Sequence, residues 1–238
     1  MSEYGYHSSR EFRRPQISVT KNLPFPTEYV TALENECAHV AFSEERAPRN
    51  QGLWRSQVFN VTTDTPMDVE IGTGNGTHFR HHVTKNPGRC LVGLELKYKP
   101  LIQTIRSALR EGCKNAAICR YHAMNIDLLF STNEINDVYI HFPDPWVSPR
   151  KPRNRFVNRR VLGMLAQLQR PGSQIEFKTD SREYFDWAME EIKESSYKII
   201  YSTFDLHNSE KSVGNVITTF ERIFMRKNIP INYVLLQK

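Results

Sequence analysis

Short apolar runs alternate with amphipathic stretches from about residue 67 to the end of the chain. Runs rich in Val, Ile and Leu are typical of strands that are buried on both faces of a sheet. They predict strands at 67–71, 90–94, 117–121, 137–141, 174–178 and 197–203, and a last strand in the terminal sequence INYVLLQK.

The stretches between these runs repeat their apolar residues every three to four positions, which is typical of helices with one buried face. They predict helices near 77–84, 100–111, 155–169 and 183–194, and a further helix over about 26–42. Strands that alternate with helices pair in parallel and are covered on both faces. The expected fold is therefore α/β: a doubly wound, mostly parallel, seven-stranded sheet that binds ligands at the carboxyl ends of its strands.

The chain of 238 residues has no linker rich in Gly, Ser or Pro that would divide it. Residues 1–25 lack periodicity and carry several arginines, so we expect a flexible basic arm followed by a single domain at 26–238. The formal net charge is +6, from 32 Lys and Arg against 26 Asp and Glu. This excess suits a polyanionic partner such as nucleic acid, although many basic proteins bind none.

Several classes of protein are not expected. The four cysteines form no CxxC pair, which argues against a disulfide framework and a zinc site, so we predict no metal. The basic start of the chain is not followed by an apolar stretch, and no run reaches the roughly 18 apolar residues of a membrane span. We expect a cytoplasmic protein that does not bind a membrane.

A Gly-rich motif, DVEIGTGNG, links the strand at 67–71 to the following helix. Gly72 and Gly74 allow a ligand to lie against the backbone of the turn. A dinucleotide fingerprint would require a third glycine at position 77, where Thr77 stands. The spacing resembles the first motif of S-adenosylmethionine-dependent methyltransferases, although a plain Gly-rich turn would also fit.

Acidic residues end two neighbouring predicted strands. Glu95 follows Gly72 by 23 residues (95 − 72), close to the spacing of a carboxylate that accepts both hydroxyls of a ribose. Glu70 would lie near the cationic amino-acid end of S-adenosylmethionine, whereas a pyrophosphate would be repelled by it. The pair favours a cationic nucleoside cofactor over a nicotinamide dinucleotide.

The sequence His-Phe-Pro-Asp-Pro-Trp ends the fourth predicted strand. Two prolines restrict the backbone around Asp144, and Trp146 follows with an aromatic face. A fixed carboxylate beside a stacking surface suits a looped-out base. An ordinary Pro-Asp-Pro turn is the alternative.

Taken together, FPDPW, EIGTGNG and GLE resemble the tRNA (guanine-N7)-methyltransferase family. Lys178-Thr179-Asp180 with Tyr184, and the sequence TTFER at 218–222, resemble two later motifs of this family. The matches extend from about Asp68 to Arg222. The resemblance implies a class I S-adenosylmethionine-dependent methyltransferase that transfers a methyl group to N7 of a guanine in tRNA and releases S-adenosylhomocysteine.

The resemblance also implies roles for individual residues. Asp144 would be catalytic, bonding the guanine edge and balancing the positive charge that the ring acquires. The expected cofactor-binding residues are Glu70, Gly72, Gly74, Glu95, His122 and Ala123. The expected substrate-binding residues are Trp146, Ser148, Arg150, Arg153, Asp180, Thr218, Phe220 and Glu221.

This chain departs from the family pattern at two positions. His122 stands where the family has an Asp or Asn before Ala, and Asn125 or Asp127 could contact the adenine instead. Ser148 replaces a Lys, although arginines such as Arg150 and Arg153 remain in the same loop. These basic residues either contact RNA or form a solvated charge run.

Two other functions remain open at this point. The chain could be a methyltransferase with another RNA or small-molecule acceptor, or a non-catalytic RNA-binding protein of the same fold. The expected partner is tRNA, and the chain could be a monomer or a homodimer.

Overall fold

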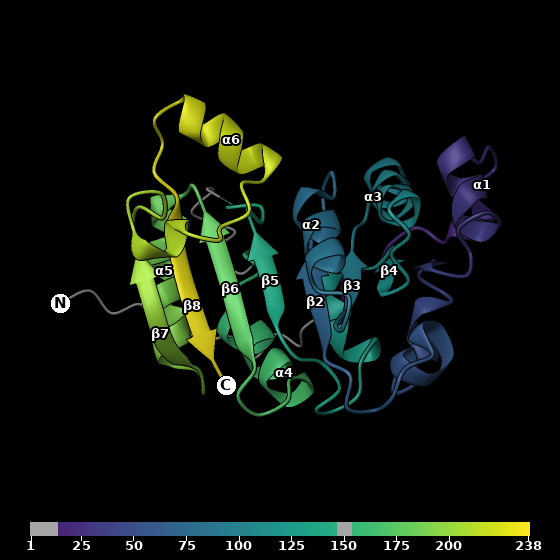
Figure 1. Ribbon diagram of the computed structural model, residues 1–238, viewed down its shortest axis with the longest axis horizontal. Helices are drawn as coiled ribbons and strands as arrows, with labels where there is room; N and C mark the ends of the chain where they lie inside the picture. Colours follow the sequence, from purple (N-terminus) through teal and green to yellow (C-terminus); the bar gives the residue numbers. More distant parts are fainter. Residues whose placement is uncertain (1–13, 147–153) are drawn as a thin grey trace.

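The computed structural model of the protein describes residues 14–146 and 154–238. Ser148, Arg150 and Arg153, which belong to the predicted substrate contacts, lie outside these residues. Within the described ranges, one sheet has eight strands in the order β1-β4-β3-β2-β5-β6-β8-β7 (Figure 1). The strands are β1 Ala41–Phe42, β2 Met67–Ile71, β3 Cys90–Leu94, β4 Ala116–Cys119, β5 Val138–His141, β6 Gln174–Thr179, β7 Lys198–Thr203 and β8 Asn232–Gln237.

The sheet is parallel except at β8, which runs antiparallel to both β6 and β7. The predicted α/β class and mostly parallel sheet are therefore confirmed, but the predicted count of seven strands is wrong. The additional strand is β1, which pairs with β4 at the edge of the sheet. Its two residues are too few to produce an apolar run that can be recognised in a sequence.

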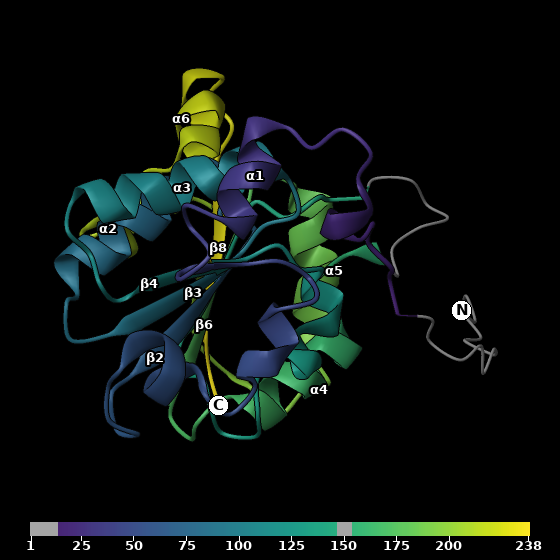
Figure 2. The ribbon, with the colours of Figure 1, turned by 90° about the vertical axis from the view of Figure 1, so that its right-hand side faces the viewer.

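Helices cover both faces of the sheet. They are α1 Glu28–Glu34, α2 Thr77–Lys85, α3 Tyr98–Arg110, α4 Arg159–Leu168, α5 Arg182–Lys193 and α6 Thr219–Arg226. Figures 1 and 2 show α1, α2 and α3 on one face and α4 and α5 on the other, with α6 above the carboxyl ends of the strands.

Two of these helices differ from the sequence-based expectation. The helix predicted over 26–42 ends at Glu34, because Asn35 leaves the helical region at φ −123° and ψ −85°. The short α6 was not predicted as a helix.

Each face of the sheet has its own apolar core. On one face, Leu33, Phe79 and Ile102 pack against β3 and β4, and on the other, Val161 and Phe185 pack against β5 and β6. The two cores fix the strands in register, so that the ends of β2, β3, β5 and β6 lie along one edge. None of the helices in the described ranges is long and apolar enough to cross a membrane.

Candidate active site

The turn after β2 leaves open space above its glycines. Gly72 and Gly74 have positive φ angles of 73° and 54°, and a Cβ atom added to either would meet nothing within 4 Å. Gly76, at φ 75°, packs so closely on α3 that a Cβ would lie 2.5 Å from Thr104 Oγ1. Thr73 Oγ1 is buried and has no hydrogen-bond partner among the described residues. The turn therefore offers an accessible backbone and an unused hydroxyl to a ligand.

Glu95 lies beside this turn at the carboxyl end of β3. Its Oε2 accepts a hydrogen bond from Gly74 N at 3.0 Å, and its Oε1 accepts one from Lys97 N at 2.9 Å. These bonds fix the carboxylate, and each oxygen keeps a further lone pair for a hydroxyl donor. The geometry suits a ribose.

Glu70 has a different environment. Its side chain is only 4% exposed, and its Oε2 lies 2.9 Å from Nδ1 of His78 on α2. The carboxylate thus joins β2 to α2 and places negative charge behind the glycine turn. A direct contact with the cofactor stays a prediction.

His122, at the end of β4, caps the short helix η4 (Ala123–Leu128) by accepting a hydrogen bond from Met124 N through Nδ1 at 3.2 Å. Burial lowers the pKa of His122, so the imidazole is neutral at pH 7. Because Nδ1 accepts, the proton lies on Nε2, which is a donor. Ala123 follows as the first residue of η4.

Asn125 and Asp127, the two alternative contacts for the adenine, differ in whether their side-chain oxygens already accept hydrogen bonds. Asp127 accepts from both terminal nitrogens of Arg14, at 2.7 and 2.6 Å, and this bonding lowers the pKa of Asp127. Asn125 donates from Nδ2 to Pro15 O at 2.9 Å, while its buried Oδ1 has no hydrogen-bond partner in the described ranges. The Asn125 oxygen is therefore unused, whereas both Asp127 oxygens are already engaged by a charged partner.

These bonds attach residues 14–20 to the domain. Arg120 NH1 donates to Ser18 O at 2.8 Å, and Thr20 Oγ1 donates to Glu44 Oε2 at 2.7 Å. Figure 2 shows this segment in purple as it leads toward α1. The predicted boundary between arm and domain at residue 25 stays a prediction.

Asp144 is held in an unusual backbone segment after β5. Phe142 and Trp146 have positive φ angles of 53° and 44°, a conformation that residues other than glycine adopt at an energetic cost and that often marks functional loops. Asp144 is exposed and makes no hydrogen bond or ion pair with the described residues. Its carboxylate is available to a substrate.

Arg155 fixes this loop from below. Its guanidinium is 4% exposed, donates from Nε to Pro145 O at 2.9 Å, and pairs with Glu183 Oε1 at 2.6 Å. It also lies 5.3 Å from the ring centre of Trp187. Arg155 therefore supports the Asp144 loop from within the fold.

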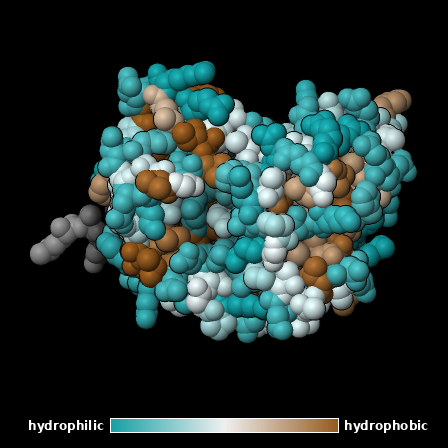
Figure 3. Space-filling model, in the orientation of Figure 1, coloured by the Kyte–Doolittle hydropathy of each residue, from teal (hydrophilic) through white to brown (hydrophobic). Residues whose placement is uncertain are grey.

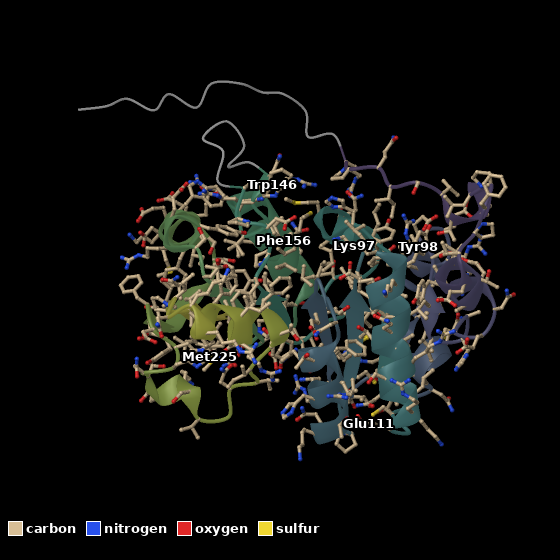
Figure 4. The ribbon with its side chains drawn as sticks, turned by 90° about the horizontal axis from the view of Figure 1, so that it is seen from above. Lys97, Tyr98, Glu111, Trp146, Phe156 and Met225 are labelled. Carbon is tan, nitrogen blue, oxygen red and sulfur yellow. The ribbon has the colours of Figure 1, made fainter. Side chains whose placement is uncertain are left out.

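An aromatic and an acidic residue also follow the ends of β5 and β6. Trp146 is 38% exposed, and in the view of Figure 4 it lies on the other side of the molecule from Met225 of α6. Asp180 is half-buried after β6, and this burial raises the pKa of its carboxyl. The arrangement gives a partly desolvated acid and a stacking surface close to the ends of β5 and β6.

The 218–221 segment begins α6. Thr218 and Glu221 form a capping box, in which Thr218 Oγ1 accepts from Glu221 N at 3.2 Å. Glu221 is fully buried and accepts from Asn215 Nδ2 at 2.6 Å, whereas Phe220 is 55% exposed. Phe220 is presented to solvent, while contacts of Thr218 and Glu221 with a nucleotide stay predictions.

One supporting residue was missed by the sequence reasoning. Lys178 is 2% exposed, and its Nζ lies 2.5 Å from Asn215 Oδ1 and 3.3 Å from Glu176 Oε1. The signal was present in the sequence, since a lysine inside a strand predicted to be buried needs anionic or amide partners. In the described part of the chain, no group of three His, Cys, Asp or Glu could hold a metal ion.

Comparison with known proteins finds relatives that are named methyltransferases. A family model described as "Putative methyltransferase" matches residues 64–233. A tRNA (guanine-N(7)-)-methyltransferase of Bdellovibrio bacteriovorus is 62% identical over 207 residues, which cover 87% of this chain and 99% of that protein. A protein of the same name from Lachnoclostridium phytofermentans is 29% identical, covering 89% and 94%.

Solved structures resemble the fold. The 16S rRNA methyltransferase KamB superposes with a TM-score of 0.52 at 16% identity, covering 72% of this chain and 87% of that chain. A second structure, titled an antibiotic related methyltransferase, gives 0.51 at 16% identity and covers 73% and 87%. At this identity the likeness concerns the fold alone.

Proposed function

The chain belongs to the family of tRNA (guanine-N(7)-)-methyltransferases, and from this premise we propose which of its side chains carry out the reaction. The protein is an S-adenosylmethionine-dependent enzyme that methylates N7 of a guanine in tRNA. The observation that carries the assignment of roles is the exposed carboxylate of Asp144, which has no hydrogen-bond or ion-pair partner among residues 14–146 and 154–238 and follows the same sheet edge as the open glycine turn and Glu95.

The residues at the end of β2 and β3 fit the cofactor. When bound, S-adenosylmethionine supplies a methyl group on a positively charged sulfur. Glu95 accepts the ribose hydroxyls, and the backbone of Gly72 and Gly74 receives the amino-acid end. Glu70 acts from behind the turn, where its negative charge favours a cation.

The adenine would lie against His122 and Ala123. The exocyclic amino group of adenine is a donor, and Nε2 of His122 is also a donor, so this group needs another acceptor. Asn125 Oδ1 provides one, since it is buried and has no hydrogen-bond partner in the described ranges. His122 then donates to a ring nitrogen.

Asp144 acts on the base. Guanine N7 has a lone pair and no proton, so the reaction needs alignment and electrostatic support more than a strong base. Alignment alone can lower a barrier by about 7–11 kcal/mol. As the methyl group arrives, the guanine ring gains positive charge, which the Asp144 carboxylate stabilises.

The remaining predicted contacts surround the base and its backbone. Trp146 and Phe220 offer exposed rings for stacking, and Asp180 offers a second carboxyl group. Arg150 and Arg153, with Ser148, would contact phosphates of the tRNA. We propose that residues 26–238 act as a single methyltransferase domain, as a monomer or a homodimer.

The test is methyl transfer from labelled S-adenosylmethionine to unmodified tRNA, with the product nucleoside identified by mass and retention. We expect 7-methylguanosine. A label in another nucleoside would contradict the acceptor, and cofactor binding without any transfer would favour the non-catalytic RNA-binding alternative.

A further inference from the structure

A hydrogen bond joins the glycine turn to α6. Asn75, between Gly74 and Gly76, donates from Nδ2 to Oγ1 of Thr219, the first residue of α6. The amide is oriented by its other atom, because Asn75 Oδ1 accepts from Thr77 Oγ1 at 3.0 Å. The cofactor turn and the substrate segment are thus in direct contact, although they lie 144 residues apart in sequence.

A groove lies between α2 and the loop that precedes α6. One wall is formed by His78 and His82 of α2, the floor by Tyr139 and Glu176, and the other wall by the loop that precedes α6. Figure 3 shows the surface hollowed between α2 and the loop that precedes α6. The bond between Asn75 and Thr219 joins the turn before α2 to the first residue of α6, which follows this loop.

The helix α6 has little other support. Glu221 is its one fully buried residue, and the apolar side chains of Phe220, Ile223 and Met225 are 55%, 41% and 38% exposed. Phe224 stacks on Phe142 at 5.6 Å between ring centres. The contacts of the first turn, together with the packing of Phe220 and Phe224 on Phe142, therefore position Phe220 relative to the Asp144 loop.

A buried platform holds the same turn from the sheet side. Lys178 Nζ lies 3.9 Å from Glu221 Oε2 and bonds Asn215 Oδ1, and Glu176 beside it accepts from His141 Nε2 at 2.7 Å. Lys178 connects α6 to β6, whereas Asn75 connects α6 to the cofactor turn. The first contact joins α6 to the sheet, while the second ends in the segment that we propose receives the cofactor.

We propose that Asn75 is a positioning residue that couples cofactor binding to tRNA binding through Thr219. The inference rests on the proposed function of the same site. A cofactor bound against the glycine turn favours the arrangement in which Asn75 holds Thr219, and Phe220 is kept beside Phe142, at the start of the Asp144 loop, for the incoming base. Linkage requires that tRNA strengthens cofactor binding by the same factor.

The experiment measures the Kd of unmodified tRNA with and without saturating S-adenosylhomocysteine. For the wild type we expect a ratio of about tenfold, within the usual range of such couplings. Asn75→Ala and Thr219→Val should each reduce the ratio by about fivefold, the effect of one hydrogen bond. The double variant should lose no more than either single variant, and Thr219→Ser, which keeps the hydroxyl, should retain the wild-type ratio.

The outcomes separate the possibilities. A ratio of one in the wild type, an unchanged ratio in Thr219→Val, or losses that multiply in the double variant would each overturn the inference. Thermal unfolding of every variant checks the fold, and the Ser–Val comparison remains decisive if Asn75→Ala does not fold. If the wild type forms no 7-methylguanosine, the proposed function fails. If the wild type forms 7-methylguanosine but the Kd ratio is the same in the wild type and in the variants, the proposed coupling fails and the proposed function stands.

Discussion

Asp144 differs from Glu70, Glu95 and Glu221 in having no hydrogen-bond partner among the described residues, and from the half-buried Asp180 in being exposed. Asp144→Asn keeps the shape of the side chain and removes its charge. We expect the single-turnover rate of methyl transfer to fall by about a hundredfold or more, because the charge on the ring develops mainly in the transition state. The Kd of tRNA should stay within about twofold, since an exposed carboxylate adds little to ground-state binding.

A matched control is Asp64→Asn, which makes the same charge change at an exposed position before β2. Its rate should equal that of the wild type. Full turnover in Asp144→Asn, with unchanged tRNA binding, would show that Asp144 does not stabilise the transition state.

His141 makes stability depend on pH. Burial, helped by the nearby Lys178 ammonium, lowers the pKa of His141 to about 3, against about 6.5 in an unfolded chain. Below pH 6.5 the unfolded chain therefore takes up a proton that the folded protein does not. The stability contributed by the neutral imidazole is present above pH 6.5 and is lost as the pH falls toward 3.

Between pH 7.5 and pH 5 we expect this residue to remove about 2 kcal/mol from the free energy of unfolding. His141→Gln can still donate to Glu176 but does not titrate, so its unfolding free energy should fall by that much less over the same interval. Urea unfolding at the two pH values measures both proteins. An equal fall in each would mean that His141 does not titrate as described.

At the scale of elements, the contact between β3 and the cofactor turn depends on Gly93. A Cβ there would lie 2.6 Å from Thr73 Cγ2 and 2.9 Å from Phe79 Cε2. Gly93→Ala should therefore lower the free energy of unfolding by about 2 kcal/mol, because a close-packed core tolerates an added methyl group poorly. Denaturant unfolding measures the loss.

The matched change is Gly163→Ala on α4, where a Cβ meets nothing within 4 Å. In a helix this substitution should stabilise the protein by about 0.5–1 kcal/mol. If the two substitutions had the same effect, the packing at Gly93 would not be as tight as the distances indicate.

Most of the elements that the sequence predicted have a buried apolar face, although β7 was predicted from its apolar run and is largely exposed. The runs that became β2 and β3 are fully buried, and the structure has both at the predicted residues. In contrast, β1 has two residues, and α6 buries a single carboxylate. The capping pattern T-x-x-E of α6 was visible in TTFER, but a helix with an exposed apolar side does not give the periodicity that was sought.

For the molecule as a whole, topology explains why the candidate site could be predicted at all. Gly72, Glu95 and Asp144 follow parallel strands, whose carboxyl ends necessarily share an edge. The pairing of Glu70 with His78, the support of the loop by Arg155 and the bond between Asn75 and Thr219 could not be predicted. These depend on which side chains meet across distant segments, and no spacing rule encodes that.

The charge of the whole molecule, +6, enters through tRNA binding. If Arg150 and Arg153 each contact a phosphate, the double change Arg150→Gln with Arg153→Gln should reduce the slope of log Kd against log salt by about 1.5. The loss of affinity should be similar for all tRNA sequences, because phosphate contacts carry no sequence information.

The matched control is the double change Lys85→Gln with Lys114→Gln, which removes the same charge near the starts of β3 and β4, away from the site edge. Its slope should stay close to that of the wild type, since charges beyond a Debye length of about 8 Å are screened at physiological salt. Equal reductions in both double variants would mean that tRNA responds to net charge alone, and the loop after Trp146 would lose its assigned role.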